Sequence, residues 1–210
     1  GTHHPGEAPF DPALPNPHER IGDIDLVNEA GANFTRWGEI STRYATAWQR
    51  DQNGRQFLEK ARALVLELRE RNPRDPMVPY LLGAIESELR NYEAAIPLLE
   101  QAARDRPFDS VCRARLADAY AKTQRTGDAI SEMQKAIDLV PEQPLYHQRL
   151  IGYSLDARRY DNALQWMDRY VEAMKAGSAE HRDALDWVAA QQRRIPADAR
   201  RSAVNSTAIQ

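Results

Sequence analysis

The sequence predicts an all-α protein, a right-handed solenoid of about four stacked helix hairpins that ends in a capping helix. Prolines recur with a period of about 34 residues, at Pro73, Pro107 and Pro141. Alanines recur with the same period, at Ala61, Ala95, Ala129 and Ala163. A proline cannot continue a helix, and one hairpin alone cannot bury its apolar stripe. This period is therefore typical of hairpins that stack to form one continuous core.

The N-terminal extension, residues 1–33, carries five prolines in its first twenty positions and has room for a short helix near its end. Phe10 and Leu14 are the large apolar residues of the proline-rich stretch. We expect an extended segment that docks through these two side chains on its own repeats or on a second copy, which leaves a homo-oligomer open. A free amino terminus at Gly1, with His3 in the third position, could bind Cu(II) or Ni(II). We favour a processing or cloning boundary at Gly1, and so expect no metal and no cofactor.

The repeat domain is expected over residues 34–177. Phe34, Trp37, Ile40, Tyr44 and Trp48 share one stripe of a helix over 34–52. This helix would be the first of a divergent opening repeat. The predicted repeats are 42–75, 76–109, 110–143 and 144–177.

Within repeat 76–109, Asn91 is expected to cap the second helix, and Gly83 with Ala95 to let the two helices cross closely. Pro97 lies inside that second helix, near its start, and predicts at most a local kink on the outer face. Ser178 is expected to cap the last helix, and residues 178–196 have the narrow apolar stripe of a capping helix. Residues 197–210 are predicted to be a tail.

The pattern of these segments resembles the tetratricopeptide repeat family. Segment 76–109 carries the pattern at Leu82, Gly83, Tyr92, Ala95, Leu99, Ala102 and Pro107. Segment 110–143 carries it at Leu116, Ala117, Tyr120, Ala129, Met133, Ala136 and Pro141. The last and first repeats match more weakly. The resemblance implies a groove, lined by the first helix of each repeat, that binds a peptide segment of a partner protein.

Placing this sequence on the family pattern implies a set of groove residues. They are Arg43, Thr46, Arg50, Met77, Tyr80, Ala84, Ser87, Val111, Ala114, Asp118, Lys122, Leu145, Gln148 and Gly152. The lysines and asparagines with which one subclass grips a terminal carboxylate are missing at these positions. The implied groove is small and apolar at its centre and has Arg43, Arg50 and Lys122 toward its edges, which favours an extended apolar or proline-containing segment with some acidic character.

Composition and motifs exclude several classes of function. The net charge of −3 offers no broad basic field for nucleic acid. No apolar run is long enough to enter a membrane directly. Nucleophile, phosphate-loop and metalloprotease motifs are missing, and His147 and His181 stand alone, so we expect no enzyme. The single Cys112 allows no internal disulfide. A soluble chain is expected, in either the cytoplasm or the periplasm.

The sequence thus predicts a protein-interaction scaffold or adaptor. One alternative is a repeat module or subunit of a larger bacterial-type assembly, such as envelope or cofactor-assembly machinery. A minor alternative is a copper- or nickel-binding head on a scaffold.

Overall fold

The computed structural model describes residues 28, 30, 32, 47–197, 199 and 200, and for residues 47–53 the backbone alone. This part holds eight labelled helices and no strand. They are α2 (Ala47–Arg71), α3 (Met77–Glu88), α4 (Tyr92–Asp105), α5 (Ser110–Lys122), α6 (Thr126–Leu139), α7 (Pro144–Asp156), α8 (Tyr160–Ala173) and α9 (Ala179–Gln192). The chain divides into two compact units, residues 1–78 and 79–210, which are described separately.

The first unit contains α2, one helix of 25 residues. The sequence predicts a helix that ends near residue 52, but α2 runs without a break to Arg71. No proline interrupts it, and Arg55 pairs with Glu59 one turn away. Gly54 costs about 1 kcal/mol relative to alanine, which is too little to end a helix of this length. The part of the predicted helix at 34–46 lies outside the described residues, as does most of the proline-rich extension.

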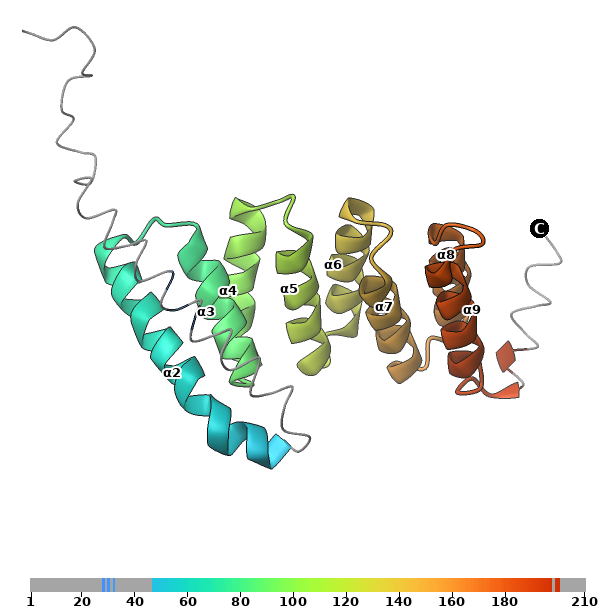
Figure 1. Ribbon diagram of the computed structural model, residues 1–210, viewed down its shortest axis with the longest axis horizontal. Helices are drawn as coiled ribbons and strands as arrows, with labels where there is room; N and C mark the ends of the chain where they lie inside the picture. The colour runs from blue at the N-terminus through green and yellow to red at the C-terminus, as the bar shows by residue number, and fades with distance from the viewer. Residues whose placement is uncertain (1–27, 29, 31, 33–46, 198, 201–210) are drawn as a thin grey trace, which may run out of the picture. The chain divides into compact units, whose positions relative to one another are not determined.

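The second unit is a series of helix hairpins, α3 with α4, α5 with α6 and α7 with α8, followed by α9 (Figure 1). The first two residues of α3 belong to the first unit. From α4 to α9, each helix packs against the next helix in the chain. The all-α solenoid predicted from the sequence is confirmed here, and α9 takes the position of the expected capping helix.

The core of the second unit is continuous because neighbouring hairpins share it. One group of buried residues joins α4 to α5, a second joins α5, α6 and α7, and a third joins α7, α8 and α9. The periodic alanines Ala95, Ala129 and Ala163 are fully buried. Gly83 lies so close to α4 that a Cβ atom there would meet the Leu99 side chain at 2.7 Å. The expected close helix crossing is therefore present at Gly83.

Each hairpin turns through the same hydrogen-bonded motif. Arg90, Gln124 and Arg158 have left-handed backbones, with φ of 66°, 63° and 56°. The amide that follows each of them donates to a carbonyl five residues earlier, and the first of these bonds, from Asn91 to Glu86, is 2.8 Å long. This pattern is the Schellman motif, in which glycine is the usual left-handed residue. The three positions are spaced by one repeat each, so the turn recurs with the period of the sequence.

The ends of two repeats also share one type of hydrogen bond, between a side chain and the carbonyl of the repeat's last proline. Arg113 donates from Nε and Nη2 to the Pro107 carbonyl, at 3.0 and 2.9 Å. His147, at the equivalent position of the next repeat, lies 2.7 Å from the Pro141 carbonyl through Nε2. In both repeats a side chain near the start of the first helix thus satisfies the carbonyl of the proline that ends the preceding repeat.

Three local features that the sequence predicts, two helix caps and one proline within a helix, have different outcomes in the structure. Ser178 accepts from the His181 amide at 3.1 Å, so it caps α9 as expected. Asn91 stands at the start of α4, but its side-chain oxygen makes no capping bond, and its side-chain amide nitrogen donates to Glu86 at 2.8 Å. Pro97 is exposed within α4, and the helix continues beyond it.

Candidate partner-binding groove

The candidate site is a hollow of about 350 Å³ where the first helices of three successive hairpins come together. It is lined by Ser87, Glu88, Tyr92, Arg115, Asp118, Lys122 and Arg149. Apart from Tyr92, these residues belong to α3, α5 and α7. The structure thus brings together three of the predicted groove residues, Ser87, Asp118 and Lys122.

Long polar side chains bridge the three first helices. The Arg115 guanidinium on α5 lies 3.3 Å from Glu88 on α3. Asp118 on α5 accepts from both Arg149 and Tyr153 on α7. The four side chains in these two ion pairs are between 26% and 36% exposed, so solvent reaches the hollow. Ion pairs therefore link α3 to α5 and α5 to α7 along the groove.

The charges around Asp118 determine what the hollow accepts. Burial raises the pKa of Asp118, and the nearby Arg149, the Tyr153 hydroxyl, Arg115 and Lys122 oppose that rise. Burial and the neighbouring Asp118 carboxylate raise the pKa of Tyr153, so this hydroxyl stays protonated and donates. The carboxylate is thus already satisfied by protein donors.

The lining has a surplus of positive charge. Three cations face the two carboxylates of Glu88 and Asp118. The exposed ammonium of Lys122 forms no ion pair with any residue in the described part of the chain. A ligand group with negative charge can therefore bind at Lys122 without displacing an existing pair.

The other predicted groove residues differ widely in how much of their surface is exposed to solvent. Ala84 and Ala114 are buried, with 4% and 2% of their surfaces exposed, so they present almost no area to a partner. Val111 and Leu145 are about half exposed and occupy the same position in successive repeats. Both stand near the start of their helices, at the other end of α5 and α7 from Lys122.

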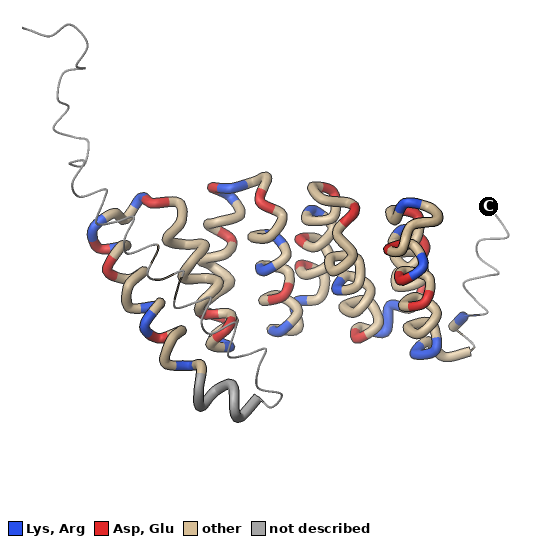
Figure 2. Tube along the Cα trace, viewed as in Figure 1, with Lys and Arg blue, Asp and Glu red and all other residues tan. Residues whose placement is uncertain are grey.

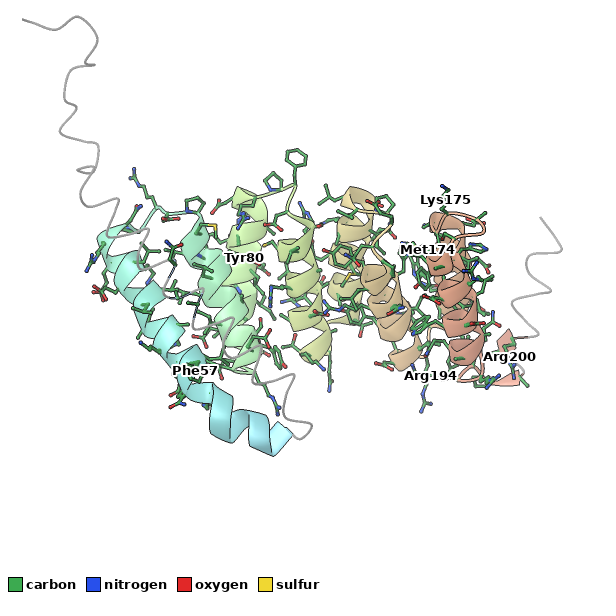
Figure 3. All side chains as sticks on the ribbon, viewed as in Figure 1. Phe57, Tyr80, Met174, Lys175, Arg194 and Arg200 are labelled. Carbon is green, nitrogen blue, oxygen red and sulfur yellow. The ribbon has the colours of Figure 1, made fainter. Side chains whose placement is uncertain are left out.

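The remaining predicted positions carry structural contacts or stay undescribed. Tyr80 is half-buried under the Arg106 guanidinium, 4.9 Å from its ring centre (Figure 3). Gln148 donates to the Tyr170 hydroxyl at 3.1 Å, and Gly152 has open space where a side chain would point. Met77 is half-buried at the start of α3. Arg43, Thr46, Phe10 and Leu14, and the side chain of Arg50, lie outside the described residues.

Sequence reasoning missed Arg115, Arg149 and Glu88. The signal was available, because Arg115 and Arg149 are separated by one repeat period, as are Glu88 and Lys122. Charged residues that recur with the same 34-residue period as the buried alanines lie on one face of the stacked helices.

Other site types find little support among the described residues. That part of the chain contains no group of three or more histidine, cysteine, aspartate or glutamate side chains able to hold a metal ion. None of its helices combines the length and apolar character needed to cross a membrane. Burial raises the pKa of the Cys112 thiol to about 11, so it is protonated near neutral pH.

Comparisons with known proteins agree with this geometry. A family model described as tetratricopeptide repeat matches residues 88–151, which contain most of the candidate groove. Among solved structures, MamA from Desulfovibrio magneticus RS-1 (residues 41 to the end) is 20% identical, with a TM-score of 0.54 over 73% of this chain and 99% of that chain. A second MamA structure, from AMB-1, is also 20% identical, with a TM-score of 0.54 over 75% and 97% of the two chains. A search of curated protein sequences finds no match. At this identity the solved structures show the fold alone.

Proposed function

Because residues 88–151 consist of tetratricopeptide repeats, we propose that the chain is a scaffold that binds an extended segment of a partner protein across the first helices α3, α5 and α7. The observation that carries this proposal is the hollow of about 350 Å³ on these helices, with its surplus cation at Lys122. A concave, solvent-open site of this size takes a few side chains of a bound segment.

The lining favours a segment that carries an acidic side chain. Lys122 offers an ammonium with no ion pair among the described residues, while Arg115 and Arg149 are held in place by Glu88 and Asp118. Preformed donors reduce the ordering cost of binding. Val111 and Leu145, exposed toward the other end of α5 and α7, offer apolar contact to the rest of an extended segment.

The test compares Lys122→Glu with Arg104→Glu as the matched control. Arg104 is exposed on α4 and likewise forms no ion pair within the described residues, so both variants make the same charge change on the surface. Each protein is used as bait in an extract of the source cells. Proteins recovered by wild type are identified by mass spectrometry, and their acidic segments are synthesised as peptides for calorimetric titration.

We expect Lys122→Glu to weaken peptide binding by about tenfold, which corresponds to about 1.4 kcal/mol, and Arg104→Glu to leave it unchanged. Equal affinity of wild type and Lys122→Glu for every recovered segment, with both proteins folded by circular dichroism, would refute the groove as the binding site.

A further inference from the structure

A second charged surface lies at the end of the second unit, where the α7–α8 turn meets the segment that follows α9. Five exposed arginines form it: Arg158, Arg159, Arg193, Arg194 and Arg200. Figure 2 shows basic residues in blue at the α7–α8 turn, at the end of α9 and in the short described stretch that follows it. We call it the arginine patch.

The two segments are held together by specific contacts. Arg194 forms an ion pair with Asp156, at the end of α7, at 3.1 Å. Ile195, only 1% exposed, packs into the core group of α7, α8 and α9. Ala199 and the α7–α8 turn line one hollow of about 290 Å³, together with Arg158, Arg159, Tyr160, Asp161 and Asn162. The patch is therefore a built surface rather than a chance grouping in the sequence.

Most of the positive charge in the patch is not neutralised. Of its five arginines, only Arg194 forms an ion pair with a described residue. The acids nearby are Asp156, already paired with Arg194, and Asp161 at the rim of the hollow. Asp198 and Arg201 are close in sequence, cancel each other in formal charge, and lie outside the described residues. A local excess of cations on a chain with net charge −3 concentrates an anionic partner there.

We propose that the arginine patch is a second binding surface, separate from the groove, for an acidic segment of a protein, rich in aspartate or glutamate. Guanidinium groups form planar, paired hydrogen bonds with carboxylates, which suits several arginines around one hollow. The alternative, an anionic membrane surface, is less favoured because no large exposed apolar residue of the described chain belongs to the patch. Amphipathic membrane-binding surfaces combine basic residues with such apolar side chains.

The test measures binding of a fluorescent polyglutamate peptide to the full chain by anisotropy. The patch variant is Arg158→Gln/Arg159→Gln/Arg200→Gln. Glutamine is suitable at position 158 because Gln124 occupies the equivalent left-handed position one repeat earlier. The control is Arg90→Gln/Arg104→Gln/Lys175→Gln, which removes three exposed cations that also form no ion pair within the described residues. Lys175 lies at the opposite end of α9 from Arg194 (Figure 3).

We expect the patch variant to bind the peptide about tenfold more weakly than wild type, and the control to change affinity by less than about twofold. Binding to wild type should weaken between about 50 and 200 mM salt, because exposed charges are screened. Because this peptide can also bind at Lys122 in the groove, the patch substitutions are repeated in Lys122→Glu, where the tenfold loss should remain and separates the patch from the groove.

An equal loss in the patch variant and the control would overturn the proposal, since it would show attraction by overall charge alone. A second measurement uses sedimentation with phosphatidylcholine vesicles that contain about 30% phosphatidylserine. If wild type binds these vesicles through the patch and does not bind the peptide, the surface is a membrane site and the proposal is wrong.

Discussion

The substitution Gly83→Ala tests the closest helix contact in the second unit. The added Cβ would lie 2.7 Å from Leu99 Cγ, 2.9 Å from Leu99 Cδ2 and 3.2 Å from the Leu99 backbone nitrogen. Carbon atoms in contact are normally about 3.5–4.0 Å apart, so the Leu99 side chain or α4 itself must shift. Leu99 is fully buried, and a close-packed core offers it little room.

The expected size of the effect follows from two opposing contributions. Overpacking a core costs about 1–3 kcal/mol. Replacing a helical glycine by alanine returns up to about 1 kcal/mol through helix propensity. With the full return, we therefore expect Gly83→Ala to reduce the free energy of unfolding by up to about 2 kcal/mol, and in no case to stabilise the protein as a helical glycine-to-alanine change normally would.

The matched control is Gly152→Ala, also in a first helix, where an added Cβ meets nothing within 4 Å. It gains the helix propensity without the clash and should raise stability by about 0.5–1 kcal/mol. Urea unfolding followed by circular dichroism at the helix band gives both differences. Equal stabilisation by the two substitutions would refute the close approach of α3 and α4 at Gly83.

Three further predictions concern turns, protonation and packing. Gln124→Gly places glycine in the left-handed position of the α5–α6 turn and should raise the unfolding free energy by about 1 kcal/mol, measured by urea denaturation. Burial lowers the pKa of His147, against its hydrogen bond to Pro141, so the unfolded chain binds the proton more readily and stability should fall as pH drops below about 6.5. His147→Gln should flatten that dependence in melting curves recorded from neutral to mildly acid pH, and an unchanged slope would contradict this reasoning. Met133→Ala, at a fully buried position, should cost about 2–5 kcal/mol in the same urea assay.

The repeat could be predicted from the sequence because its physical causes leave a regular trace. Ala95, Ala129 and Ala163 are fully buried at equivalent positions of successive hairpins. Small buried residues recur with the repeat because every hairpin makes the same packing contact. The family match and the helices of the second unit confirm that interpretation.

The opening of the chain and the details of the groove could not be predicted in the same way. Ala61 and Pro73 keep the repeat period in the divergent first repeat, so the sequence predicted two helices there, whereas α2 runs without a break from Ala47 to Arg71. Ala84 and Ala114 fall on the groove positions of the family pattern, but neighbouring side chains cover such short residues. Arg115 and Arg149 recur with the repeat, but their pairing with Glu88 and Asp118 depends on a spacing between helices that only the folded chain provides.

The three equivalent Schellman turns are positions at which whole repeats can be deleted or duplicated in the gene. A deletion of residues 91–124 would join Arg90 directly to Arg125, and the Arg125 amide would then stand in the place from which Asn91 donates to Glu86. A tandem duplication of the same stretch would create one more junction of the same type. Whole hairpins can therefore be added or removed at these joints without a new backbone conformation, so the number of hairpins, and with it the length of the groove, is open to variation by recombination.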